Sequence, residues 1–288
     1  PDLPVQNLLV DPSGVQAGGL VTLRWEDWNL GSSAAAIAFD DHIVVKNVGA
    51  NLVLLDTSVS YNPLELNNGL ANGPIRAGEH RDRSFTFRLP DGLKGAGNIG
   101  ITIAADQNSA GLGVLFETNL SNDAETNNSA AVQTVSAAKA YADLNVDSVS
   151  APAQVIGGGP VTVNWSVSNQ GLADTQADWN DQVVFSTDAI IGNADDVVIG
   201  TVRHTGGLHV SESYSQTATF NVPMRSEGRY YLGVRSDKAG EVIEPDTRAN
   251  NDSAAKPVDL TTPYADLIAS TVSAPANALS GENILVTW

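Results

Sequence analysis

Short segments that alternate apolar and polar side chains run through most of the chain. The clearest is Val161-Thr-Val-Asn-Trp-Ser-Val167, in which every second residue is apolar. A period of two places the valines and Trp165 on one face of a β-strand and the polar residues on the other. The pattern predicts a strand that is buried on one face only.

Further segments rich in apolar and β-branched residues follow, and turn-forming sequences such as Asn-Gln-Gly and Gly-Gly separate them. They cover residues 181–185, 197–202, 213–222, 229–235 and 241–243. The stretch 129–142 fits a last strand and a linker better than a helix, because its Val and Thr residues favour strands. About seven short strands in roughly 120 residues are typical of a two-sheet sandwich. The sequence predicts an all-β protein of immunoglobulin-like β-sandwich modules.

The same residues recur along the chain. Tyr141-Ala-Asp-Leu144 returns 123 positions later as Tyr264-Ala-Asp-Leu267, and Trp165 returns as Trp288 at the same spacing. The N-terminal part repeats the pattern more loosely. The matching elements are Asp2-Leu3 with Asp143-Leu144, Pro12 with Pro152, Trp25 with Trp165, Asn29-Leu-Gly31 with Asn169-Gln-Gly171, Phe39-Asp-Asp41 with Trp179-Asn-Asp181, and Asn127-Asn128 with Asn250-Asn251. We predict one module at 1–140, a second at 141–263 and the opening strands of a third at 264–288. The tryptophans would fill the space between the sheets.

Charge and composition narrow the classes of partner. Asp and Glu outnumber Lys and Arg by 33 to 15, which gives a formal net charge of −18 and argues against a nucleic-acid partner. The chain has no cysteine, so disulfides and thiol chemistry are excluded. No apolar run approaches the roughly 18 residues that a membrane-spanning helix needs. We expect no membrane span in this segment.

The second predicted module resembles a known family. Its motifs are Asp143-Leu144, Val163-Asn-Trp165, Asn169-Gln-Gly171, Trp179-Asn-Asp181, Ser186-Thr-Asp188, Asp195-Asp-Val-Val-Ile-Gly200, Tyr230-Tyr-Leu232, Glu244 and Asn250-Asn251. Together they resemble the CARDB module, the cell-adhesion-related domain found in bacteria. The first module resembles it in part, because Lys46-Asn-Val48 replaces Ser186-Thr-Asp188. The resemblance implies an immunoglobulin-like extracellular module, usually in tandem, with no established catalytic role.

One acidic loop is a candidate metal site. Residues 188–196 contain the oxygen-bearing side chains of Asp188, Asn193, Asp195 and Asp196 around Gly192. Calcium prefers carboxylate, amide and carbonyl oxygens, and a short loop with glycine can gather several of them. The spacing differs from that of an EF-hand, and aspartates also cap turns in solvated hairpins. The two alternatives are a calcium site and a set of turn caps.

A second acidic group precedes the predicted third module. Glu244, Asp246 and Asn250 lie there, next to Asn251 and Asp252. Calcium at this junction would stiffen a tandem rod, whereas the same side chains could serve only in turns.

Other motifs do not support catalysis. Gly95-Ala-Gly-Asn-Ile-Gly100 matches the dinucleotide fingerprint in letters, but a strand pattern follows it where a helix is required. The four histidines do not form a zincin pair, and the chain lacks the Gly-x-Ser-x-Gly elbow of a hydrolase. We predict a non-enzyme.

Two functions compete on this evidence. The first is a structural and adhesive repeat of a surface adhesin, stalk or filament, located outside the cell or on the bacterial surface. Its partners would be neighbouring modules, copies of itself or a cell-surface ligand. The alternative is a ligand- or carbohydrate-binding accessory module of a secreted hydrolase, with Trp28 and the pair Tyr230-Tyr231 as candidate contacts.

Overall fold

Alternating burial along β13 (Pro160–Asn169) shows how the period of two builds the fold. In the computed structural model, which describes residues 1–11, 14–67, 69–263 and 265–288, Val161, Val163 and Trp165 are buried and the residues between them are exposed. The predicted strand is confirmed. Pro12 and Tyr264, two members of the repeat, lie outside the described residues.

The N-terminal half forms two facing sheets. A three-stranded sheet has the order β1 (Val5–Asp11), β3 (Leu20–Trp28), β8 (His80–Arg88). A five-stranded sheet has the order β2 (Val15–Gln16), β10 (Ser129–Ala137), β9 (Gly97–Ala104), β4 (Phe39–Asn47), β5 (Leu52–Tyr61). The hairpin of β6 (Leu66–Asn67) and β7 (Leu70–Ala71) and the 3-10 helix η1 (Gly92–Gly95) complete this first sandwich.

The second sandwich repeats the topology. Its three-stranded sheet has the order β11 (Leu144–Ser150), β13, β16 (Ser213–Asn221), and η2 (Arg248–Asn251) is its 3-10 helix. Its five-stranded sheet has the order β12 (Gln154–Ile156), β18 (Lys256–Thr261), β17 (Gly228–Ser236), β14 (Trp179–Ser186), β15 (Val197–His204). In both halves the shortest strand pairs in parallel with the last one, and the other pairs within these sheets are antiparallel. The all-β sandwich prediction is confirmed.

Each sandwich has its own apolar core between its sheets. Trp25 lies in one core and Trp165 in the other, each only 2% exposed. Trp179 is also fully buried in the second core, whereas Trp288, which the repeat places at the same position as Trp165, is 86% exposed. The buried tryptophans give each half a separate hydrophobic interior.

The Asn-x-Gly motif fixes the first strand of each sandwich. The Oδ1 atom of Asn169 accepts hydrogen bonds from the backbone N–H groups of Asp143 and Gly171, both 3.1 Å away. A Cβ at Gly171 would lie 2.4 Å from the carbonyl oxygen of Tyr141, so only glycine permits this close approach. Asn29 makes the matching contacts to Asp2 and Gly31 in the first sandwich.

One segment differs from the predicted strands. Residues 241–243 do not form a strand; Glu241 and Val242 donate their N–H groups to the buried carboxylate of Asp237 instead of to a neighbouring strand. Residues 265–288 are exposed, and their one β-bridge within the described residues joins Ser273 to Thr287. The opening strands of a third module remain a prediction. The Gly95–Gly100 segment runs from η1 into β9, so a strand follows these glycines as expected.

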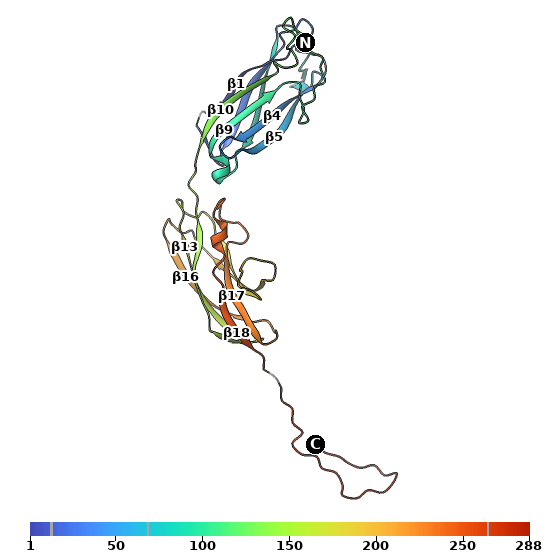
Figure 1. Ribbon diagram of the computed structural model, residues 1–288, viewed down its shortest axis with the longest axis vertical. Helices are drawn as coiled ribbons and strands as arrows, with labels where there is room; N and C mark the ends of the chain where they lie inside the picture. Colours follow the sequence, from blue (N-terminus) through green and yellow to red (C-terminus); the bar gives the residue numbers. More distant parts are fainter. Residues whose placement is uncertain (12–13, 68, 264) are drawn as a thin grey trace.

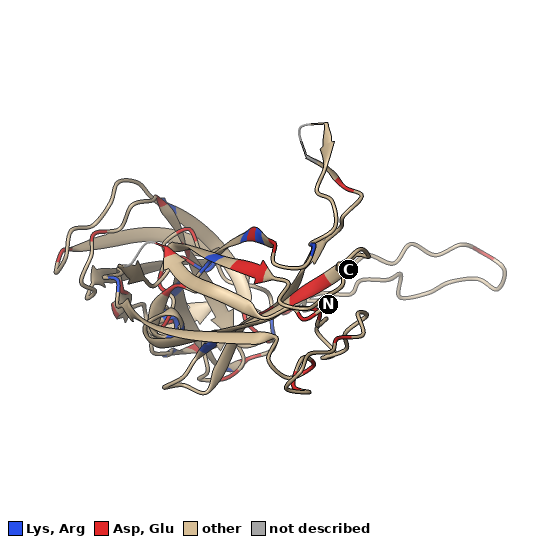
Figure 2. Cartoon of the chain, turned by 90° about the horizontal axis from the view of Figure 1, so that it is seen from above, with Lys and Arg blue, Asp and Glu red and all other residues tan. Residues whose placement is uncertain are grey.

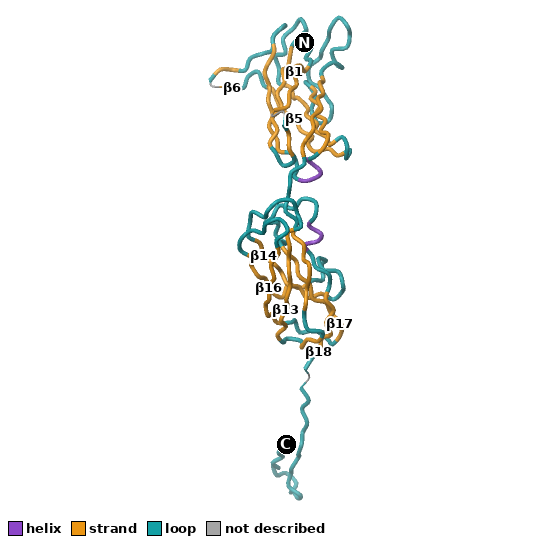
Figure 3. The backbone as a smooth tube through the Cα atoms, turned by 90° about the vertical axis from the view of Figure 1, so that its left-hand side faces the viewer, coloured by secondary structure: helices purple, strands orange, loops and turns teal. Residues whose placement is uncertain are grey.

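The two sandwiches follow one another along the long axis of the molecule (Figure 1). The chain enters the first sandwich at one end, leaves it at the opposite end after β10, and continues through a short linker into β11 (Figures 1 and 3). Figure 2 shows that Lys and Arg are few and scattered among the Asp and Glu positions. No helix among the described residues is long and apolar enough to cross a membrane.

Candidate functional site

The acidic loop 187–196 connects β14 to β15 at one end of the five-stranded sheet. Asp188 accepts a hydrogen bond from the N–H group of Ile190 at 2.7 Å, and the Asn193 amide donates to the same carboxylate at 3.1 Å. Asp188 thereby caps the turn and holds Asn193. These contacts belong to the turn-cap alternative.

Asp195 turns back toward the end of β14. Its Oδ2 atom accepts hydrogen bonds from the N–H group of Thr187 at 2.9 Å, from the Thr187 hydroxyl, and from the Ser186 hydroxyl at 3.1 Å. These hydrogen bonds, that of the Thr187 hydroxyl first, lower the pKa of Asp195 to about 2. Asp195 is therefore an ionised carboxylate that closes the base of the loop.

Asp196 has a nearly buried carboxylate, with a side chain only 3% exposed. Its Oδ2 atom accepts a hydrogen bond from the N–H group of Gly192 at 2.6 Å and lies 3.9 Å from the Arg235 guanidinium. Arg235 is bound mainly to Asp252, at 2.8 Å. Positive charge from β17 thus offsets part of the negative charge of the loop.

Two oxygens of the loop lack partners. Among the described residues, the Oδ1 atoms of Asn193 and Asp196 are buried and accept no hydrogen bond. Buried oxygens of this kind normally bind a proton donor, a water molecule or a cation. In the described part of the chain, Asp188, Asp195 and Asp196 do not bring one oxygen each within 4.8 Å of one another. The unpartnered atoms are one carboxylate oxygen and one amide oxygen, both of a kind that hard cations bind, and the three carboxylates do not converge on one point within the described residues.

The side chains of the second acidic group bind two different parts of the chain. Glu244 accepts a hydrogen bond from the N–H group of Leu144, and Asn250 donates to Asp143 at 2.8 Å, so both hold the start of the module. Asp246 points to the other sandwich and accepts a hydrogen bond from the N–H group of Leu93 at 2.9 Å. The Oδ1 atom of Asn250 is buried without a partner among the described residues, as is that of its counterpart Asn127 in the first sandwich.

The glutamate contact recurs in both sandwiches, and the sequence analysis missed it. Glu117 accepts hydrogen bonds from the N–H group of Leu3 at 2.6 Å and from the Asn128 amide at 3.2 Å. Glu244 makes the same two contacts, to Leu144 and Asn251. Burial raises the pKa of Glu117 to about 7 and also raises the pKa of Glu244. The repeated pairs Asp-Leu and Asn-Asn could have indicated these glutamates, because each glutamate lies in sequence between the two pairs whose residues it binds.

The hydroxyl of Tyr141 fixes the linker to the first sandwich. It donates to Asp91 at 2.8 Å and accepts from the N–H group of Gly92 at 3.2 Å. Asp246 adds its contact to Leu93 from the second sandwich, 2.9 Å away. Three hydrogen bonds therefore connect η1 and the residue before it to Tyr141 of the linker and Asp246 of the second sandwich.

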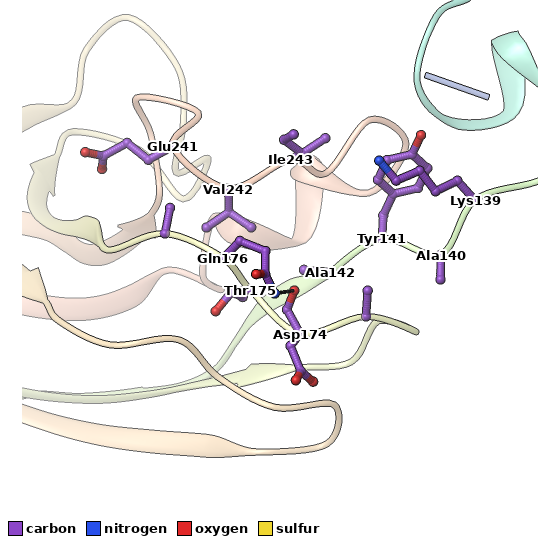
Figure 4. A pocket seen from close by; sticks show the side chains of 12 residues that line it. Lys139, Ala140, Tyr141, Ala142, Asp174, Thr175, Gln176, Glu241, Val242 and Ile243 are labelled. Carbon is purple, nitrogen blue, oxygen red and sulfur yellow. Dashed lines mark hydrogen bonds between the residues drawn. The ribbon is translucent and has the colours of Figure 1, made fainter. Parts of the chain in front are cut away.

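A pocket of about 230 Å³ lies beside this linker (Figure 4). Its walls are the linker residues 139–142, the loop 173–177 and the segment 241–243. Tyr141 lies on the linker, and Val242 and Ile243 lie on a separate segment of the pocket wall (Figure 4). The segment 241–243, although not a strand, thus forms part of the surface that receives the linker.

The second sandwich matches a known family. The CARDB family model matches residues 141–255, and no curated protein matches the chain. A crystal structure of the CARDB domain of a Pyrococcus furiosus protein, described as a complex with di-metal ions, is 19% identical and covers 42% of this chain and 90% of its own, with a TM-score of 0.32. Its solution NMR structure is 20% identical, with 42% and 97% coverage and a TM-score of 0.31. Red sea bream transglutaminase is 12% identical over 91% of this chain and 31% of its own, with a TM-score of 0.29.

Proposed function

We propose that this chain, in which residues 141–255 form a CARDB domain, is a non-catalytic extracellular repeat that adds length and orientation to a bacterial adhesin, stalk or filament. One observation carries the proposal: the chain enters a sandwich at one end and leaves it at the other (Figure 1). Each added sandwich of this kind lengthens the molecule rather than thickening it. The modules 1–140 and 141–263 are the repeating units, and each is the other's partner.

The junction contacts support the same function. A flexible linker of a few residues would let adjacent sandwiches reorient freely, whereas the hydrogen bonds of Tyr141 and Asp246 restrict their relative orientation. A rod that projects a binding tip from a cell surface requires such restriction. Chains that contain further repeats would extend in the same direction.

Small-angle X-ray scattering tests this proposal. A variant with a second copy of residues 141–263 inserted after residue 263 should have a maximum dimension longer by about the length of one sandwich. A repeat that instead packs beside its neighbour would leave the maximum dimension almost unchanged and contradict the proposal. Attachment of beads coated with the chain to cells then distinguishes an adhesive repeat from a purely structural one.

The carbohydrate-binding alternative finds little support in the aromatic side chains. Trp28 is half-buried, stacks on His80 with ring centroids 4.4 Å apart, and donates to Glu26 at 2.6 Å. Tyr230 is half-buried and stacks on Phe185 at 4.9 Å. Binding of the chain to a glycan array would favour the accessory-module function over the structural one.

The loop 188–196 is the calcium site in this proposal. The support is the buried, unpartnered Oδ1 atom of Asp196 together with that of Asn193, which hard divalent cations bind well. Glu244 and Asn250 bind the start of the second sandwich, whereas Asp246 binds the first sandwich, so the proposal is confined to the first loop.

Thermal unfolding with calcium and with a chelator tests the site. Calcium at 100 times its dissociation constant would stabilise the folded chain by about 2.7 kcal/mol. Asp196→Asn should abolish this stabilisation, whereas Asp259→Asn, which alters an exposed ion pair with Arg229, should preserve it. A midpoint that does not depend on calcium in the unaltered chain assigns the loop aspartates to turn capping alone.

A further inference from the structure

A second set of metal-ligating side chains lies on the outer face of the first sandwich, far in sequence from the acidic loop. Glu26 on β3 and Asp82 on β8 are directly opposite each other, and His80 follows opposite Trp28 on the same strand pair. One ligand atom each of Glu26, His80 and Asp82 lies within 4.8 Å of the other two. An imidazole and two carboxylates are thereby brought to one point of the sheet.

The charge arrangement needs compensation. Like charges directly opposite each other on neighbouring strands are destabilising. The nearby cations have other partners: Arg83 contacts the buried Asp27 and Asp41 at 3.0 and 3.2 Å, and Arg24 pairs with Asp11 at 3.6 Å. Asp82 has an 87% exposed side chain that contacts His80 at 3.6 Å. A bound cation would compensate the two carboxylates.

The second sandwich shows that the fold does not require these charges. The pairing registers place Ser166 and Ser215 at the positions of Glu26 and Asp82, and Ser213 at the position of His80. All three ligand-type side chains of the first sandwich are thus hydroxyls in the second. The three residues are a feature of this module alone.

Neighbouring side chains orient two of the three ligands. The Oε2 atom of Glu26 accepts hydrogen bonds from the Trp28 indole at 2.6 Å and from the Asn7 amide at 2.7 Å, which leaves Oε1 available. Asn7 reaches Glu26 from a bulge in β1, where its φ is 52°. The His80 ring stacks on Trp28 with ring planes 24° apart. Such supporting contacts around ligand side chains raise the affinity of metal sites.

We propose that Glu26, His80 and Asp82 bind a divalent transition-metal ion, of which Zn²⁺ is the representative. Imidazole nitrogen with carboxylate oxygens suits Zn²⁺, Ni²⁺ or Cu²⁺, whereas Ca²⁺ prefers oxygen ligands alone. Three protein ligands leave a tetrahedral ion at least one position for water or for a ligand from another molecule. This site is independent of the calcium loop and of the rod-like function.

Isothermal titration of the metal-free full chain with ZnCl₂ tests the site. We expect one saturable site that His80→Ala and Glu26→Gln each weaken by at least about tenfold, while Asn7→Ala weakens it less. His209→Ala is the matched control, because His209 is also an exposed histidine beside an aspartate, Asp174, at 2.8 Å. It should leave Zn²⁺ binding unchanged.

A transplant completes the test. Ser166→Glu, Ser213→His and Ser215→Asp together should give the second sandwich a Zn²⁺ site, so that the chain binds a second ion. The visible absorption of bound Co²⁺ should identify a nitrogen and oxygen ligand set, and His80→Ala should remove it. Absence of Zn²⁺ binding, or equal loss in the His80 and His209 variants with unchanged thermal midpoints, would overturn the proposal.

Discussion

The indole Nε1 atom of Trp165 donates a hydrogen bond to Oδ2 of Asp181, 2.7 Å away, and so joins the two sheets of the second sandwich through its core. Trp25 and Asp41 make the same contact at 3.2 Å in the first sandwich. The surroundings differ: Asp181 also accepts from Tyr214 and Ser236, whereas Asp41 lies beside Asp27 and Arg83. Tryptophans at equivalent positions of the two sandwiches thus donate their indole N–H groups to two different polar clusters.

Substitution by asparagine should reduce the free energy of unfolding more at Asp181 than at Asp41. Asp181→Asn removes acceptor capacity from three buried donors and should reduce the free energy of unfolding by about 2–3 kcal/mol. Burial, followed by repulsion from Asp27, raises the pKa of Asp41 well above its usual range and so favours the protonated form, which asparagine resembles. Asp41→Asn should cost about 1 kcal/mol or less. Denaturant unfolding of both variants measures the difference, and equal costs would contradict this account.

The stability of the first sandwich should fall as the pH rises from 5 to 8. Burial raises the pKa of Asp27 to about 6 and that of Glu117 to about 7 in the folded state, above their ordinary values of 3.8 and 4.5. Carboxyl groups with raised pKa values stabilise the fold fully below their ordinary pKa, and this stabilisation disappears as the pH passes the folded value. Calorimetry between pH 5 and 8 should therefore show a falling midpoint.

Glu117→Gln is the matched variant for this pH dependence. Glutamine does not titrate and keeps an acceptor for Leu3, so the midpoint should change less between pH 6 and 8 than in the unaltered chain. Glu227→Gln, at an exposed position that accepts from Thr262, should retain the full dependence. A Glu117→Gln variant with an unchanged pH profile would assign the effect to Asp27 and its neighbours.

Strands and their repeat could be predicted because burial on one face leaves a period of two in the sequence. The segment 241–243 misled the analysis, since Val242 is apolar and buried but its N–H group is bound by the Asp237 side chain. The Arg248 side chain in turn donates to the Val242 carbonyl. Side chains that replace a neighbouring strand leave no periodic signal, so the pattern alone cannot distinguish the two cases.

The sequence predicts which ligand types the candidate site offers but not how they are arranged. The types and spacing of Asp188, Asp195 and Asp196 indicate oxygen ligands, but not that each of them accepts a hydrogen bond from a backbone N–H group of the loop itself. Arg235, which lies near Asp196, is brought there by the pairing of β14 with β17. Contacts of this kind depend on sheet order, which short-range sequence patterns do not contain.

Loss of the repeated glutamate contact should release the first strand of the second sandwich. Glu244→Ala leaves the N–H group of Leu144 and the Asn251 amide without acceptors and should cost about 2–3 kcal/mol. Glu244→Gln keeps one acceptor and should cost less. Hydrogen exchange at the Leu144 amide measures this release. In Glu244→Ala the exchange rate should increase more at Leu144 than at other amides of the sandwich. Unchanged exchange at Leu144 would mean that the Glu244 side chain does not hold this strand.

Removal of the Tyr141 hydroxyl should loosen the junction without unfolding either sandwich. Tyr141→Phe deletes the hydrogen bonds to Asp91 and Gly92 but keeps the ring. These groups are partly solvated, so water replaces the lost contacts. We expect the free energy of unfolding to change by less than about 1 kcal/mol and the thermal midpoint to change little. The distribution of orientations between the sandwiches should broaden, because only one of these three hydrogen bonds, that of Leu93 to Asp246, remains.

The absence of cysteine makes this broadening measurable. Spin labels on cysteines introduced at the exposed positions Lys46 and Thr217 report the distance between the sandwiches. The distance distribution should be narrow in the unaltered junction and wider in Tyr141→Phe, and wider still when Asp246→Ala is added. Asp246→Asn is the control, since its amide oxygen still accepts from Leu93 and should preserve the narrow distribution. If Tyr141→Phe has the same distribution as the unaltered chain, these hydrogen bonds do not orient the modules and the stiffness of the rod must come from apolar contacts at the linker.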